Sequence, residues 1–296
     1  GTGVVALIKG RNSEKQCVAL RADLDALPIH EENEVPYKSK NKGVMHACGH
    51  DVHTTCLLGA ANVLNQLKNE FEGTIKLIFQ PGEERLPGGA SMMINEGVLE
   101  NPKVDKILAL HVYPSMDVGK VGFKPGLYMA ACDELYLTIK GKGGHAAIPQ
   151  SSSDSILATS ATIQSLQQIV SRKQNPLDSV VVSVTQINSG TGFNIIPEKS
   201  EFIGTIRTIN PNVRKSVHKQ FLEICKMTAS AYGCTAEVEI INGYPVTVNS
   251  VNESEKAIKV AQKLIYRKGR ILVRKSGTES KIRVRGESEN KTLLKK

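Results

Sequence analysis

Four side chains that can bind or orient a metal ion fall within six residues in the first fifth of the chain. They belong to the segment His46-Ala47-Cys48-Gly49-His50-Asp51-Val52-His53. An apolar run ending in Asp23 and Asp25 precedes it, and apolar residues at helical spacing over about 54–71 follow it. Thiolate, imidazole and carboxylate ligands together suit Zn²⁺, and they also accommodate Mn²⁺, Co²⁺ or Ni²⁺. The segment therefore predicts half of a metal site, in a loop between a strand and an amphipathic helix.

Further polar groups follow other apolar runs in this part of the chain. The composition predicts a helix over 90–97 and strands over 3–9, 17–25, 74–80 and 106–110. Glu83 and Glu84 come just after the third strand, and His111 follows the fourth. Ligands of open α/β sheets bind beyond the carboxyl ends of the strands, so we expect these groups to converge on one crevice.

Neighbouring carboxylates allow a division of labour. Because successive side chains at a strand end point in opposite directions, one of Glu83 and Glu84 can bind metal while the other takes a proton from the attacking water. A solvated charged turn is the alternative. Asp23, Asp25 and Asp51 are expected either to cap turns or helices or to support the ligands. His46 and His53 are expected to orient the loop or to support the ligands.

A different pattern begins at about residue 132. Predicted strands over 134–141, 180–186, 201–208 and 235–241 and helices over 154–172 and 212–232 occur in the order β-α-β-β-α-β, that of a ferredoxin-like unit. We therefore expect an α/β protein: an open, mostly parallel sheet domain with an inserted ferredoxin-like α+β domain. The predicted boundaries are 1–125 and 245–265 for the first domain, 126–244 for the insertion and 266–296 for a basic tail.

The inserted domain carries further candidate residues. His145 lies in the Gly-rich segment 142–149, where small neighbours and Pro149 suggest close approach to another group. Asn194 and Arg207 are candidates for binding an anionic substrate, and each is otherwise a turn residue or a surface charge. His218, on a predicted helix face between polar residues, is expected to have no special role.

Charge and composition narrow the class of protein. The net charge is +9, but residues 266–296 hold eleven Lys or Arg against three Glu, which leaves only +1 for the rest. The basic balance therefore gives no argument for nucleic-acid binding by the body of the chain. No apolar run approaches the roughly 20 residues of a membrane span. Six scattered cysteines favour reduced thiols, so we expect a cytoplasmic protein.

Several segments in order resemble one enzyme family over about residues 1–265. They are Arg-Ala-Asp-Leu-Asp-Ala-Leu-Pro, His-Ala-Cys-Gly-His-Asp, Gln-Pro-Gly-Glu-Glu, Leu-His-Val, Gly-Gly-His-Ala-Ala-Ile-Pro and Asn-Ile-Ile-Pro. They are similar to metal-dependent amidohydrolases such as hippurate hydrolase, N-acyl-amino-acid amidohydrolase and plant indoleacetyl-amino-acid hydrolases. The resemblance implies hydrolysis of the amide bond of an N-acyl amino acid to a carboxylic acid and a free amino acid.

The resemblance also implies roles for individual residues. Its metal ligands, for one or two divalent ions, are Cys48, His50, Glu84 and His111. Glu83 would be the general base, His145 would stabilise the oxyanion across a homodimer formed through the inserted domain, and Asn194 and Arg207 would lie near the substrate. Asp23 and Asp51 are expected to support the ligands.

The sequence departs from that family after the inserted domain. Family members take a further His ligand there, whereas the last of the seven histidines here is His218. The alternative function is therefore an inactive, truncated or fused remnant that acts at most as a dimerising or anion-binding module. The tail supports a fusion, because residues 269–284 are similar to the phosphate-binding loop of phosphoglucosamine mutase. Arg274, Ser276, Gly277 and Thr278 match that loop.

Overall fold

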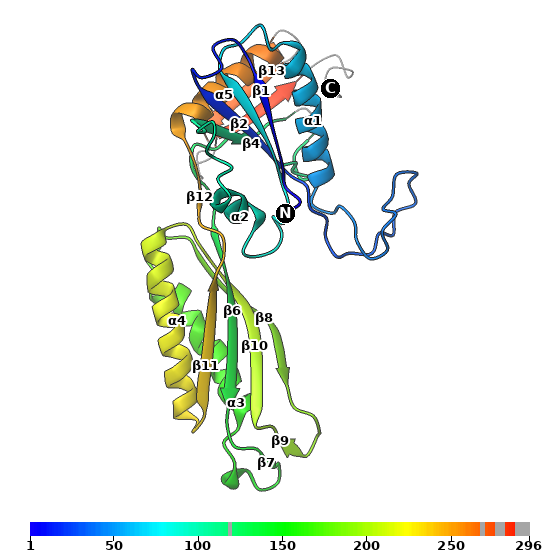
Figure 1. Cartoon of the computed structure of the whole chain (residues 1–296). Helices are drawn as coiled ribbons and strands as arrows, with labels where there is room; N and C mark the ends of the chain where they lie inside the picture. Colours follow the sequence, from blue (N-terminus) through cyan, green and yellow to red (C-terminus); the bar gives the residue numbers. More distant parts are fainter. Residues whose placement is uncertain (118–119, 267–269, 276–281, 288–296) are drawn as a thin grey trace. The chain divides into compact units, whose positions relative to one another are not determined.

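The structure is a computed structural model that describes residues 1–117, 120–266, 270–275 and 282–287, with side chains up to residue 263 (Figure 1). The chain divides into two compact units, Gly1–Asp117 and Val118–Lys296. The predicted return of residues 245–265 to the first domain remains a prediction. Within the described ranges, no helix combines the length and apolar character required to cross a bilayer.

Unit 1 is built on a four-stranded sheet. The strands are β1 (Val4–Lys9), β2 (Cys17–Asp23), β3 (Thr74–Gln80) and β4 (Lys106–Ala109), in the order β1-β3-β2-β4. β2 runs parallel to β3 and β4, and β1 pairs antiparallel with β3. The predicted mostly parallel sheet is therefore confirmed, with an antiparallel strand at one edge.

Helices pack on the two faces of this sheet. Alternate residues of β3 serve opposite faces: Leu77 and Phe79 pack in a cluster with Leu57 of α1 (His50–Gln66), and Ile78 packs with Met93 of α2 (Gly89–Asn95). Burial on both faces explains why β3 is almost continuously apolar. The apolar run is interrupted by Lys76, which is 2% exposed. Its ammonium donates to the carbonyls of Val98, Glu100 and Pro102 at 2.9, 2.6 and 2.8 Å.

Helix α1 begins four residues earlier than the sequence predicts. Gly49 stands before it with φ of 80°, and the first turn contains His50 and His53, each 1% exposed. Apolar spacing reveals the face that packs on the sheet, so a first turn whose buried residues are polar gives no such signal. His50 therefore lies on the helix rather than in the loop.

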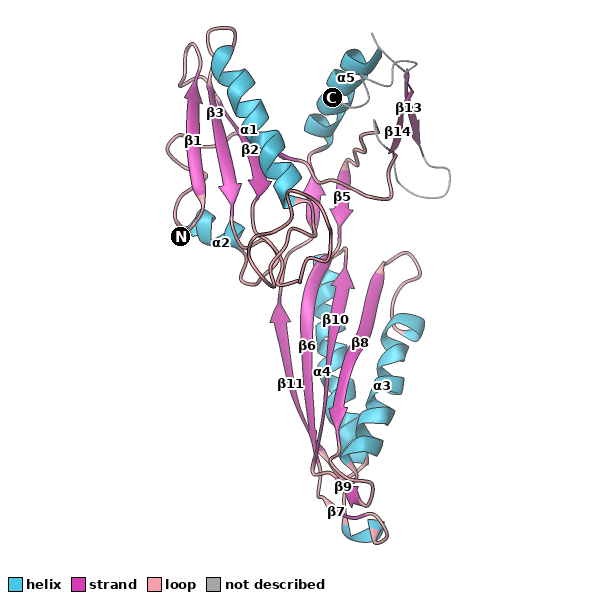
Figure 2. Ribbon diagram, turned by 90° about the vertical axis from the view of Figure 1, so that its right-hand side faces the viewer, coloured by secondary structure: helices cyan, strands magenta, loops and turns pink. Residues whose placement is uncertain are grey.

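Unit 2 contains the predicted β-α-β-β-α-β unit. Its main elements are β6 (Ala131–Lys140), α3 (Ser155–Arg172), β8 (Val180–Ser189), β10 (Lys199–Thr208), α4 (Pro211–Ala231) and β11 (Thr235–Asn242). The strands form an antiparallel sheet in the order β11-β6-β10-β8, with both helices on one face (Figure 2). Leu135 and Phe202 of the sheet and Leu166 and Phe221 of the helices are nearly inaccessible in this core.

Short elements complete the described chain. β7 (Gly144–His145) pairs with β9 (Ile195–Ile196), next to the turn η1 (Pro149–Ser151), and β5 (Gly126–Met129) pairs with β12 (Thr247–Asn249). After α5 (Val251–Tyr266), β13 (Arg270–Lys275) pairs with β14 (Ile282–Glu287). Arg274 lies on β13, whose side chains are not described, and the predicted phosphate-binding residues 276–278 lie outside the described residues.

Candidate metal centre

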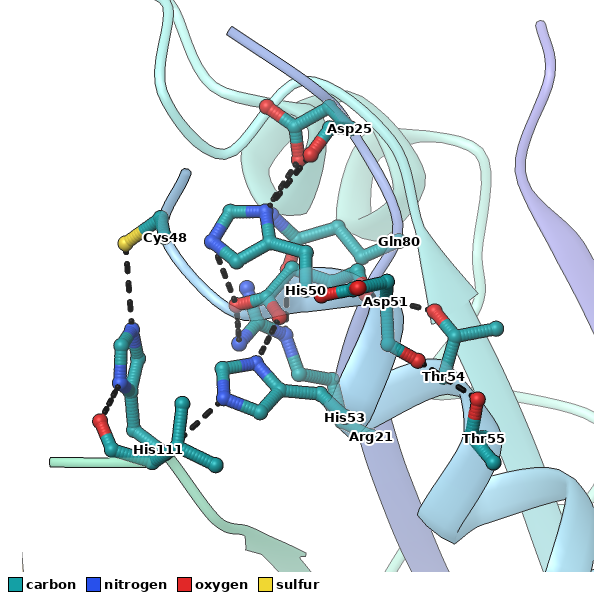
Figure 3. A network of polar contacts seen from close by, with 12 residues as sticks. Arg21, Asp25, Cys48, His50, Asp51, His53, Thr54, Thr55, Gln80 and His111 are labelled. Atoms are coloured by element: carbon teal, nitrogen blue, oxygen red, sulfur yellow. Dashed lines mark hydrogen bonds and ion pairs between the residues drawn. The ribbon is translucent and has the colours of Figure 1, made fainter. Parts of the chain in front are cut away.

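Three predicted ligands converge in unit 1 from separate elements. Cys48 lies in the loop before α1, His50 is the first residue of α1, and His111 follows β4. One ligand atom from each lies within 4.8 Å of the other two, and the Cys48 sulfur is 3.5 Å from Nε2 of His111 (Figure 3). The convergence follows from the parallel strands, because β2, β3 and β4 all end at one edge of the sheet.

Backbone carbonyls orient both imidazoles. Nδ1 of His50 lies 2.9 Å from the carbonyl of Asp25, and Nδ1 of His111 lies 2.7 Å from the carbonyl of Val112. A carbonyl only accepts, so each Nδ1 carries the proton and each Nε2 presents a lone pair. Nε2 of His50 is buried and has no hydrogen-bond partner among the described residues. An orphaned buried nitrogen beside a thiol and a second imidazole fits a bound Zn²⁺-type ion.

The two glutamates face the same site. One ligand atom each of Glu83, Glu84 and His50 lie within 4.8 Å of one another, and Oε1 of Glu84 is 3.8 Å from Nε2 of His50. The expectation that they point in opposite directions was wrong, because β3 ends at Gln80. The chain then turns, and no strand alternation applies to the pair.

Glycine residues allow the chain after β3 to turn tightly against the start of α2. The amide of Gly89 donates to the carbonyl of Gly82 at 2.8 Å, and Gly82 has φ of 61°. A Cβ on Gly89 would lie 1.6 Å from the carbonyl oxygen of Pro81. Only glycine therefore lets the start of α2 press against the segment that carries the two carboxylates.

Asp25 connects two of the ligands. Its carbonyl accepts from His50, and its carboxylate accepts from the amide of Glu84 at 3.0 Å. Burial raises the pKa of Asp25, but hydrogen bonds from the amides of Glu84 and Glu83 outweigh burial and lower it. Asp25 thus orients His50 and Glu84 together. Asp51 and His46 are exposed, and Asp51 lies in the first turn of α1, where a negative charge favours the helix dipole.

Burial and mutual repulsion set the protonation of the site. The pKa of Glu83 is raised, first by burial and then by the charge of Glu84. Burial, followed by Glu84, raises the pKa of the Cys48 thiol to about 11. The positive charge of a bound divalent cation would lower the pKa of Cys48 and favour the thiolate. Glu83 is accordingly a stronger base than an exposed glutamate.

The predicted substrate residues lie in unit 2, at two distant places. His145 and Asn194 line a hollow of about 1000 Å³ that also includes Lys199, at the start of β10. Arg207 is eight residues further along this strand, roughly 26 Å away at the usual rise. The structure therefore brings His145 and Asn194 together but not Arg207.

Unit 2 contains a second polar cluster that was not predicted from the sequence. Asp133 is fully buried, and its carboxylate accepts from Arg214 and, at 2.7 Å, from Nε2 of His218. His218, for which no special role was expected, thus contacts a buried carboxylate. A signal exists in β6: Asp133 has the same parity as Leu135 and Leu137, so it occupies a core position.

Comparison with known proteins identifies the family of the chain. The profile of Peptidase family M20/M25/M40 matches residues 19–282. The chain is 42% identical over 265 residues to an N-acetylcysteine deacetylase of Bacillus subtilis, covering 90% of this chain and 69% of the relative. It is 42% identical over 248 residues to an N-acyl-L-amino acid amidohydrolase of Geobacillus stearothermophilus, covering 84% and 66%.

A solved structure shows the same fold. A Bacillus subtilis protein described as a dinuclear metal-binding peptidase of the M20 family superposes with a TM-score of 0.73 at 37% identity. The match covers 89% of this chain and 67% of that protein. The chain thus spans about two thirds of the length of these relatives.

The α/β fold, with cysteine, histidine and glutamate side chains at the carboxyl edge of its sheet, is the arrangement of a metal-dependent hydrolase. The length of the profile match and the identity to the deacetylase identify the family of the chain. The chain belongs to the peptidase family M20/M25/M40.

Proposed function

We propose that this protein hydrolyses the amide bond of N-acyl amino acids, giving a carboxylic acid and a free amino acid. The observation that supports this best is the convergence of Cys48, His50, Glu84 and His111 beside Glu83. The names of the relatives, a deacetylase and an amidohydrolase, support the substrate class.

The residues would divide the work as follows. Cys48, His50, Glu84 and His111 would hold one or two divalent ions, of Zn²⁺, Mn²⁺, Co²⁺ or Ni²⁺. Such an ion supplies Lewis acidity toward the amide carbonyl and toward water. Glu83 takes a proton from the attacking water while the oxygen of that water bonds to the carbonyl carbon. Glu83 then gives that proton to the amide nitrogen as the carbon–nitrogen bond breaks, which balances the reaction.

His145 has the tautomer needed to stabilise negative charge. The amide of Ala147 donates to its Nδ1 at 3.1 Å, so the proton of the neutral ring lies on Nε2. His145 therefore presents an N–H donor, unlike His50 and His111, which present lone pairs. A donor of this kind suits the oxyanion that forms at the amide carbonyl. Asn194 lies in the same hollow, and its carbonyl accepts from the amide of Ala146 at 3.0 Å.

The separation within unit 2 favours a homodimer. A single N-acyl amino acid does not span the roughly 26 Å between Arg207 and the start of β10. We infer that one protomer contributes Arg207 to a substrate and its partner contributes His145 and Asn194. β8 is an edge strand with exposed Val181 and Ile187, which offers an unpaired edge for a second copy.

The remaining assignments extend the same proposal. We propose a catalytic domain made of residues 1–125 and 245–265, with 126–244 as the inserted dimerisation domain and 266–296 as a separate tail. All six cysteines are free, which fits a reducing cytoplasm. Small N-acyl amino acids are the proposed substrates, and neither nucleic acid nor a membrane is required.

The substitution Glu83→Gln tests the function. Metal-loaded wild type is expected to release free amino acid from N-acetyl amino acids, measured by reaction of the new amine. Glu83→Gln should keep its metal and lose at least ~100-fold in kcat, because the amide cannot take the proton. Glu70→Gln, an exposed glutamate after α1, serves as the control. A folded, metal-loaded wild type without any hydrolysis would instead favour the inactive remnant.

A further inference from the structure

His53 joins a buried carboxylate to the chain beside a metal ligand. Its Nδ1 lies 2.6 Å from Oδ1 of Asp23, and both residues are 1% exposed. Its other nitrogen, Nε2, accepts from the backbone amide of Val112 at 2.9 Å. Val112 directly follows His111, so His53 bridges β2 and the segment after β4.

These contacts assign the protonation of His53. A backbone amide can only donate, so Nε2 has no proton, and Nδ1 donates to the carboxylate of Asp23. The ring is therefore neutral. Arg21 balances the charge of Asp23 through a 2.7 Å contact and also donates to Gln80 at 2.8 Å. Both nitrogens of His53 are engaged by protein groups, which distinguishes it from His50 with its orphaned Nε2.

Packing reinforces the hydrogen bonds. The rings of His53 and His111 have centroids 4.4 Å apart and are inclined by 64°. Gly49 lets Val112 approach the ligand loop, since a Cβ on Gly49 would lie 2.3 Å from Cγ2 of Val112 and 3.7 Å from Nε2 of His53. His111 itself donates from Nδ1 to the carbonyl of Val112. The position of Val112 therefore determines where Nε2 of His111 points.

We propose that His53 is a positioning residue that holds His111 in its metal-binding orientation by fixing the amide of Val112. Asp23 and Arg21 hold His53 in the required tautomer. The inference rests on the proposed function because it concerns the same metal site. It differs from a general packing role in one respect: only an acceptor at the position of Nε2 can serve.

Two amide substitutions separate these roles. The amide group of Asn overlays the Nδ1 side of an imidazole, so His53→Asn can keep the contact with Asp23 but cannot reach Val112. The longer Gln places its carbonyl oxygen near the position of Nε2, so His53→Gln can accept from Val112. Cobalt(II) serves as the probe. Its affinity for the protein is measured by competition with a chelator, and X-ray absorption spectroscopy gives the number of imidazole ligands. Exposed His30→Asn is the matched control.

The expected result is a loss of about 10- to 100-fold in cobalt affinity and of one imidazole ligand in His53→Asn. His53→Gln should stay closer to the wild type, and His30→Asn should match it. Wild-type affinity and ligand count in folded His53→Asn would overturn the inference while leaving the proposed function intact. A wild type that binds none of Co²⁺, Zn²⁺, Mn²⁺ and Ni²⁺ would overturn both.

A measurement on the unmodified protein covers the case in which the variants do not fold. Imidazole ¹⁵N chemical shifts of the metal-free wild type should show His53 protonated at Nδ1 and unprotonated at Nε2. Protonation at Nε2 would be incompatible with acceptance from Val112 and would overturn the inference.

Discussion

The buried carboxylate of Asp133 offers the sharpest test of how unit 2 is held together. Its four hydrogen bonds come from Nε of Arg214 at 2.9 Å, Nη2 of Arg214, Nε2 of His218 at 2.7 Å and the amide of Gly243 at 3.1 Å. These contacts join β6 to α4 and to the segment after β11. Asp133→Asn keeps the shape but removes the charge and points an N–H donor at other donors.

The magnitude follows from burial. Removing one partner of a buried ion pair costs about 3–5 kcal/mol, because the other charge remains desolvated. At 1.4 kcal/mol for each factor of ten, the slowest amides should exchange roughly a hundred- to a few-thousand-fold faster. Hydrogen exchange measured on peptides of β6 and β10 reports this change, and peptides of β3 in unit 1 should be unaffected.

A charge-matched control lies on α4, the helix that carries Arg214 and His218. Glu223 is exposed and faces Lys219 at 3.9 Å, so Glu223→Gln should change the unfolding free energy by less than about 1 kcal/mol. If exchange in β6 and β10 of Asp133→Asn is as slow as in the wild type, the cluster contributes no net stability and the prediction is wrong.

Three further outcomes follow from particular contacts. Gly49→Ala should weaken cobalt binding, measured by chelator competition, because its Cβ would lie 2.3 Å from Val112 and φ of 80° disfavours alanine; unchanged binding would contradict the close packing. Lys76→Met should destabilise unit 1 by about 1–3 kcal/mol, seen as faster exchange in β3, because three carbonyls lose their donor; slower exchange would show that burying the ammonium costs more. Hydrogen bonds and the charge of Arg214 outweigh burial and lower the pKa of Asp133. The stabilising effect of Asp133 is therefore present above its pKa in the unfolded chain, about 3.9, and is lost as the pH falls through its pKa in the folded protein. Acid should consequently destabilise the wild type more than Asp133→Asn.

The sequence predicts the elements of this fold well because burial leaves a periodic mark. The apolar run before Gln80 gives the bounds of β3, and the polar groups after β3 and β4 lead to the site. The pattern fails where buried residues are polar. The first turn of α1, with His50 and His53, and Lys76 inside β3 are both of this kind.

Contacts between residues far apart in the chain could not be predicted from the sequence, for a different reason. His218 and Asp133 are 85 positions apart, and their contact depends on how α4 lies against β6. The roles of the histidines depend on which backbone group faces each nitrogen. His50, His53 and His145 therefore have the same side chain but present different atoms, and only the folded backbone decides between them.

The most direct test of the metal centre is the amount of tightly bound metal per chain, measured by elemental analysis of the wild type and of Cys48→Ala. We expect about one equivalent or more in the wild type and its loss in Cys48→Ala, with both proteins folded by circular dichroism. A folded wild type that retains no divalent metal after loading with Zn²⁺, Mn²⁺, Co²⁺ or Ni²⁺ would contradict this expectation.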